Sequence, residues 1–153
     1  MNLRIALVGC GQIADAHLGE ISKLENASVV GICDLYKYLL EETAIRFDVD
    51  RWFLNFEEML SETKPDVVHI CTPPSSHFQL ARTALDAGCH VYVEKPATET
   101  LDETDQLIEL AEKKGLQICP GHNWLGESCY LEAKSRIDRG EVGPIRHIEA
   151  HYG

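Results

Sequence analysis

Two glycines near the N-terminus have the spacing of a backbone site for phosphate groups. The pattern Gly9-x-Gly11-x-x-Ala14 directly follows a short apolar run and opens a helical pattern. The first glycine permits a tight turn, the second lets backbone approach a pyrophosphate, and a small third residue allows close helix packing. The amides of Gln12 and Ile13 begin the helix, whose positive end faces the phosphates. We therefore predict a dinucleotide site at Gly9, Gly11, Gln12 and Ile13.

An acidic residue stands where such a site binds a ribose. Asp34 follows the apolar run Val29–Cys33 and comes about 20 residues after Ala14. A carboxylate at the end of the second strand accepts hydrogen bonds from the adenosine ribose and repels the 2′-phosphate of NADP. Asp34 therefore favours NAD, although Lys37 is close enough in sequence to weaken that preference and leaves NADP possible.

The elements that position these residues alternate between strands and helices. Apolar runs bounded by turn residues predict strands, and apolar residues at helical spacing predict helices. The predicted strands are 5–8, 29–33, 52–54, 66–71, 90–93 and 116–119, and the predicted helices include 36–47, 100–115 and 128–139. This order predicts an α/β fold of the Rossmann type, with a doubly wound, mostly parallel sheet and helices on both faces. Ligands of such sheets bind at the carboxyl ends of the strands.

Polar residues before the helices predict where they begin. Asn55 is a typical N-cap, and Thr100 with Glu103 forms a capping-box pattern. After the proline-rich loop, either Ser75 or Ser76 is expected to cap the next helix.

The charge balance excludes several classes of partner. The 153 residues carry 14 Lys and Arg against 25 Asp and Glu, a formal charge of −11. That sign is wrong for a surface that follows nucleic-acid phosphates or an anionic membrane. Apolar runs are shorter than the roughly 18 residues of a membrane span. We expect a soluble cytoplasmic protein without nucleic-acid or membrane partners.

The cysteines and two of the histidines have the pattern of structural residues. The cysteines show no C-x-x-C and no paired short spacing, so neither a metal site nor a disulfide framework is indicated, and we expect small buried hydrophobes. The six cysteines are Cys10, Cys33, Cys71, Cys89, Cys119 and Cys129. His69 and His90 lie in or beside predicted strands and are interpreted as structural.

At the predicted loops the sequence resembles the Gfo/Idh/MocA family of nicotinamide-dependent oxidoreductases. The resemblance covers residues 3 to about 123, and Glu94-Lys95-Pro96 is its most specific segment. The other matching segments are Gly9-Cys10-Gly11-Gln12-Ile13-Ala14 with His17, Asp34, Thr72-Pro73-Pro74-Ser75-Ser76-His77 and Ala87-Gly88-Cys89-His90-Val91.

The resemblance implies roles for the later loops. Thr72, Pro73 and His77 would line the cofactor near the nicotinamide ribose. Glu94 and Lys95 would reach the nicotinamide, with Lys95 as the catalytic residue against the substrate oxygen. An ammonium there stabilises the charge that develops on oxygen during hydride transfer.

One position departs from the family pattern, and the role of two others stays open. Pro74, which we include among the cofactor-binding residues, stands where the family often has asparagine, so one contact would be lost. His122 and Asn123 resemble the link into the family's second domain. They either approach the nicotinamide, as we predict for Asn123, or are two polar residues of a loop.

The pattern of the C-terminal residues predicts the first elements of a second domain. A helix over 128–139 and a strand over 145–152 are expected, the strand with one apolar face. We interpret 1–122 as the NAD(P)-binding domain and 123–153 as a linker helix and first strand of a missing domain. In the family that domain carries the substrate pocket, acid–base partners and oligomer contacts. The resemblance thus implies a small-molecule substrate, a homo-oligomer, and poor turnover by this chain alone.

Three functions remain in competition. The leading hypothesis is an oxidoreductase that moves hydride between NAD(P) and a secondary alcohol or carbonyl of a sugar, cyclitol or related metabolite. The alternative is a non-catalytic NAD(P)-binding sensor or scaffold. A methyltransferase on a similar sheet is disfavoured, because Glu94-Lys95-Pro96 is not expected there.

Overall fold

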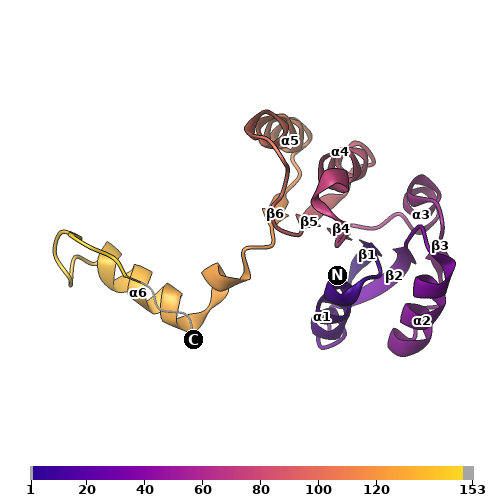
Figure 1. The fold of residues 1–153 in the computed structure, drawn as a ribbon, viewed down its shortest axis with the longest axis horizontal. Helices are drawn as coiled ribbons and strands as arrows, with labels where there is room; N and C mark the ends of the chain where they lie inside the picture. The colour runs from indigo at the N-terminus through magenta and orange to yellow at the C-terminus, as the bar shows by residue number, and fades with distance from the viewer. Residues whose placement is uncertain (1, 150–153) are drawn as a thin grey trace. The chain divides into compact units, whose positions relative to one another are not determined.

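Six strands form one sheet in the computed structural model, which describes residues 2–149 (Figure 1). All strand pairs are parallel, and the order is β3-β2-β1-β4-β5-β6. The strands are β1 Leu3–Val8, β2 Ala27–Cys33, β3 Trp52–Phe53, β4 Val67–Ile70, β5 His90–Val93 and β6 Ile118–Pro120. The predicted doubly wound sheet is confirmed. Its order reverses beside β1, where such sheets bind their ligands.

Helices cover both faces of this sheet. They are α1 Gln12–Ile21, α2 Lys37–Phe47, α3 Phe56–Thr63, α4 His77–Asp86 and α5 Leu101–Lys114. Apolar residues of α1 and α2 pack with Leu7 and Ile32 on one face. Residues of α3, α4 and α5 pack with Val68 and Val91 on the other. Each face of the sheet therefore buries a separate apolar core. The helices that cover it are drawn in Figure 1.

The helix starts confirm two of the predicted caps and correct the third. The Asn55 side chain accepts the Glu58 amide at 2.8 Å, and Thr100 forms its capping box. Ser76 stands at the N-cap position of α4, but no serine side chain forms the expected capping hydrogen bond. A 3-10 turn over Pro74–Ser76 precedes the helix, and the Pro74 carbonyl accepts the amide of His77, the first helical residue.

The chain divides into two units, Met1–Gly121 and His122–Gly153. The second contains the short 3-10 helix η2 Asn123–Gly126 and the helix α6 Ser128–Asp138, in which no residue is buried. Residues 145–149 of the predicted strand are not in a strand, and 150–152 lie outside the described residues. A strand needs a paired neighbour, and the described part of the second unit offers none.

Residues 2–149 lack two kinds of structural feature. None of their helices has the length and apolar character needed to cross a membrane. The same residues contain no group of three or more histidine, cysteine or acidic side chains placed to hold a metal ion.

Candidate functional site

The carboxyl ends of β1, β2 and β4 open onto a cleft with a volume of about 530 Å³. Pockets for small molecules have volumes of roughly 300–1,000 Å³. Gly9 and Gly11 form one wall of the cleft, Asp34 lies at the end of β2, and Thr72 and Pro73 follow β4. Three loops that are far apart in sequence therefore meet at one edge of the sheet.

The glycine turn at the end of β1 has the geometry that the sequence predicts. Gly9 adopts a φ of +92°, and a Cβ added to it would lie 2.7 Å from the carbonyl carbon of Cys71. A Cβ on Gly11 would meet nothing within 4 Å, so open space faces this position. No side chain caps α1, which leaves its first amides, at Gln12 and Ile13, for an anionic group.

Backbone amides of the loops after β1 and β2 hold the Asp34 side chain in place. Its carboxylate accepts the amides of Cys10 at 2.7 Å and Tyr36 at 2.9 Å. Two hydrogen bonds leave lone pairs of the carboxylate for the hydroxyls of a ribose. Lys37 is engaged elsewhere, since its ammonium lies 3.2 Å from Glu41 and therefore has its own counter-ion.

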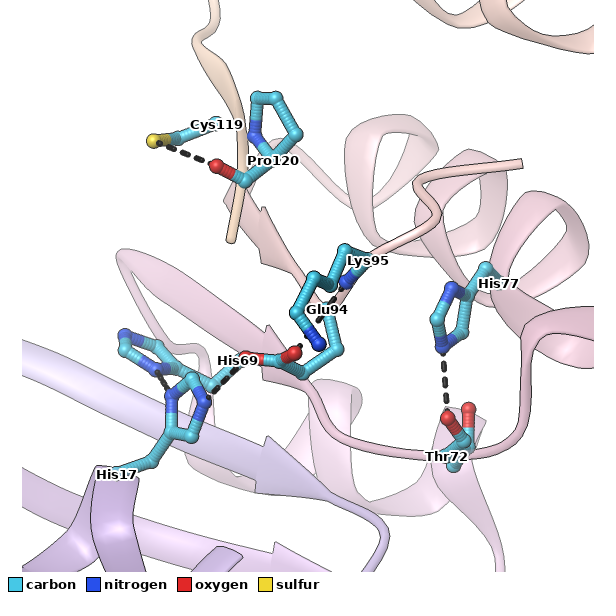
Figure 2. Close-up of polar contacts among 8 residues, drawn as sticks. All are labelled: His17, His69, Thr72, His77, Glu94, Lys95, Cys119 and Pro120. Carbon is cyan, nitrogen blue, oxygen red and sulfur yellow. Dashed lines mark hydrogen bonds and ion pairs between the residues drawn. The ribbon is translucent and has the colours of Figure 1, made fainter. Parts of the chain in front are cut away.

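The buried His77 side chain holds the loop after β4 in place through a hydrogen bond to its backbone. This residue has no exposed surface, and its Nε2 lies 2.7 Å from the Thr72 carbonyl oxygen (Figure 2). Its Nδ1 lies 2.8 Å from the Pro96 carbonyl oxygen. Thr72 and Pro73 line the cleft, whereas His77 connects that loop to the one after β5. Pro74 is exposed and begins the 3-10 turn.

The loop after β5 carries the predicted catalytic residue. Lys95 is exposed and precedes a cis Lys95–Pro96 bond. Within residues 2–149, no carboxylate lies within ion-pair distance of its ammonium. Because β5 runs parallel to β1, Lys95 stands at the same sheet edge as the glycine turn.

Two histidines join Glu94 in a polar cluster that the sequence analysis did not find. His17 Nε2 lies 2.9 Å from Glu94 Oε1, and His17 Nδ1 lies 2.9 Å from His69 Nδ1 (Figure 2). Burial, followed by the charge of His17, lowers the pKa of His69 from 6.5 to about 4, so its ring is neutral at neutral pH. The Tyr92 ring stacks on His69 with a centroid distance of 4.9 Å.

Asn123 begins η2 in the second unit. Its predicted contact with the nicotinamide stays a prediction, as does that of His122.

Burial was predicted for all six cysteines and is confirmed for four of them, whereas the prediction is wrong for Cys119 and Cys129, which are exposed. Burial is the main cause that raises the pKa of Cys10, Cys33 and Cys71 to about 12, and the nearby carboxylates Asp34 and Glu94 add to it. These thiols are free and stay protonated and unreactive at neutral pH.

We expect only Cys119 and Cys129 to react rapidly with a maleimide at pH 7, because these two thiols are exposed to the reagent whereas the other four are buried. Mass spectrometry of the labelled native chain would count the adducts, and labelling in denaturant is the control that should modify all six cysteines. Rapid labelling of Cys10 or Cys71 in the native chain would contradict the buried assignment.

A parallel sheet that presents a glycine turn and a carboxylate at its switch point defines a dinucleotide-binding domain of the Rossmann class. Residues 3–122 match the family described as Gfo/Idh/MocA, "Oxidoreductase family, NAD-binding Rossmann fold". The chain belongs to this family of oxidoreductases, and its first unit is an NAD-binding domain.

Relatives of the chain fit this membership. The chain is 38% identical to the uncharacterized oxidoreductase YhhX of Escherichia coli over 112 residues, which are 73% of this chain and 32% of the relative. It is 32% identical to D-glucoside 3-dehydrogenase of Escherichia coli over 144 residues, which are 94% of this chain and 41% of that enzyme. The chain therefore spans less than half the length of these relatives.

A solved structure has the same fold. Scyllo-inositol dehydrogenase from Lactobacillus casei, with NAD(H) and scyllo-inositol bound, superimposes with a TM-score of 0.87 at 25% identity. The comparison covers 94% of this chain and 43% of that enzyme.

Proposed function

We propose that this chain supplies the NAD-binding part of an enzyme that transfers hydride between NAD and an alcohol or carbonyl carbon. The observation that carries the proposal is the shared sheet edge, where the glycine turn, Asp34 and Lys95 stand at the ends of β1, β2 and β5. A sugar, cyclitol or related metabolite is the substrate class, which the names of the glucoside and inositol dehydrogenases support.

Each residue has a distinct part in the proposed chemistry. Bound NAD supplies the carbon that accepts or releases hydride. The open amides of Gln12 and Ile13 bind its pyrophosphate, and Asp34 binds the adenosine ribose. Thr72 and Pro73 support the nicotinamide ribose, and Lys95 places its ammonium against the substrate oxygen as charge develops there.

We infer that the substrate pocket lies in a second domain, which residues 123–153 begin. Hydride transfer from an alcohol also requires a positioned acid or base for the hydroxyl proton. Lys95 alone is an incomplete set, so the 153-residue chain should bind NAD(H) and turn over substrate poorly. Substrate-dependent formation of NADH by the purified chain would contradict this inference.

Calorimetric titration of the chain with NAD, NADH, NADP and NADPH tests the cofactor part directly. We expect NAD and NADH to bind more tightly than their 2′-phosphorylated forms. The proposal fails if none of the four binds.

Replacement of Asp34 should reduce the discrimination between NAD and NADP. Asp34→Ala removes charge-assisted hydrogen bonds worth roughly 1.5–3 kcal/mol each, so NAD affinity should fall about tenfold or more. NADP affinity should fall less, because repulsion of its 2′-phosphate disappears together with the ribose contact. Calorimetry of both cofactors measures the ratio.

Two variants control this experiment. Asp34→Asn retains an acceptor for the Cys10 amide, so it separates loss of charge from loss of loop structure. Asp50→Ala removes the same charge from an exposed position and should leave the ratio unchanged. An unchanged ratio in both Asp34 variants would refute the ribose assignment.

A further inference from the structure

The loop that carries Lys95 is connected to the glycine-turn helix through a chain of hydrogen-bonding side chains. His17 comes from α1, His69 from β4 and Glu94 from the end of β5. The distances are 2.9 Å from His69 Nδ1 to His17 Nδ1 and 2.9 Å from His17 Nε2 to Glu94 Oε1 (Figure 2). The His17 and Glu94 side chains are only 10% and 16% exposed, so water competes little for these contacts.

The donor and acceptor directions follow from the chemistry of the groups. A carboxylate only accepts, so His17 Nε2 carries a proton and donates it to Glu94. The contact between the two Nδ1 atoms holds a single proton, because two donors would repel and two lone pairs would not bond. His17 Nε2–H points to Glu94 in either placement of that proton.

The same carboxylate holds the backbone of the catalytic loop. Glu94 Oε2 accepts the Lys95 amide at 3.3 Å, while Oε1 is occupied by His17. On the other side, a Cβ added to Gly121 would lie 2.9 Å from Glu94 Oε1, so the carboxylate has little room to turn away. Both oxygens and one flank of Glu94 are therefore constrained.

We propose that His17 is a positioning residue, which fixes Glu94 through a hydrogen bond supported by His69 and so sets the place of Lys95. The role of the loop at the nicotinamide rests on the proposed function, whereas the hydrogen-bonded chain does not. His17 thereby couples the helix that binds the pyrophosphate to the loop that serves the reacting end of the cofactor.

The first test reads the histidine protons in the wild-type chain. Long-range proton–nitrogen spectra of nitrogen-15-labelled protein at pH 7 should give a protonated Nε2 on His17 and one shared Nδ1 proton between His17 and His69. An unprotonated His17 Nε2 would overturn the proposal without any variant.

The second test replaces the ring by one of similar size that cannot hydrogen-bond. His17→Phe should displace the amide signal of Lys95 and weaken NAD binding about tenfold, the effect of about one hydrogen bond. ADP-ribose, which lacks the nicotinamide, should bind as before. His90→Asn is the matched control, because His90 lies on β5 but accepts the Gln117 amide outside the chain of contacts.

The outcomes separate this proposal from the proposed function. Equal losses of NAD and ADP-ribose affinity, or no loss of either, would overturn the positioning role of His17. If the wild-type chain binds neither NAD nor ADP-ribose, the proposed function fails. The Lys95 amide signal of the His17→Phe variant is then the measurement that tests the positioning role of His17. A displaced signal then supports the role of His17, and an unmoved signal refutes it.

Discussion

Gly9→Ala should destabilise the first unit by about 3 kcal/mol or more and abolish NAD binding. The residue has a φ of +92°, where a side chain alone costs roughly 1–2 kcal/mol. Its Cβ would also lie 2.7–2.8 Å from backbone atoms of Cys71 and Thr72, which no rotamer change relieves. The end of β1 would have to move away from β4, and the turn that binds the pyrophosphate would move with it. Urea unfolding and calorimetry with NAD measure the two effects.

Gly11→Ala is the matched control within the same turn. Its Cβ would meet no protein atom within 4 Å, and its φ of −80° suits alanine. The free energy of unfolding should fall by less than about 1 kcal/mol, the cost of losing a favourable N-cap. NAD affinity should still drop, because the methyl group fills the space where the pyrophosphate approaches. Equal stability losses in both variants would contradict the different roles of the two glycines.

The fold was predictable because its signals are local. Each buried parallel strand is a short apolar run, and each helix has an apolar stripe or a recognisable cap such as Thr100. The strand expected at 145–152 shows where this reasoning fails. Its pattern suits a strand, but a strand forms only against a neighbour, and the described residues 145–149 have none.

The site was predictable only where one loop contains its chemistry. Gly9 and Asp34 could be assigned because a turn and a strand end define their roles. The cluster around His17 could not, since its partners lie 52 and 77 residues away and meet only through the register of the sheet. The resemblance implied that His77 lines the cofactor site. In the structure its ring is buried between the loops after β4 and β5, and this burial depends on packing between segments that are distant in the sequence. The sequence did offer one signal for the cluster. Alternation along β4 places the side chain of His69 on the opposite face of the sheet from those of Val68 and Ile70.

Lys95→Ala should lower kcat by about two to three orders of magnitude, the usual cost of removing one group that stabilises charge on a reacting oxygen. The measurement requires a protein that also carries the inferred substrate domain. NAD affinity of the variant should stay close to that of the wild type, because the pyrophosphate and ribose contacts come from other loops. Loss of kcat with unchanged cofactor binding is the pattern of an interaction made in the transition state.

Two further variants decide between catalysis and a sensor function. Lys95→Arg keeps the charge but changes its shape and should recover only part of the lost kcat. Lys113→Ala removes an exposed lysine from α5 and should leave kcat unchanged. A protein that binds NAD normally and shows no turnover before any substitution would support the sensor, because Lys95 would then have no reaction to serve. An active protein that is insensitive to Lys95→Ala would place the catalytic charge on another group and refute the role proposed for this lysine.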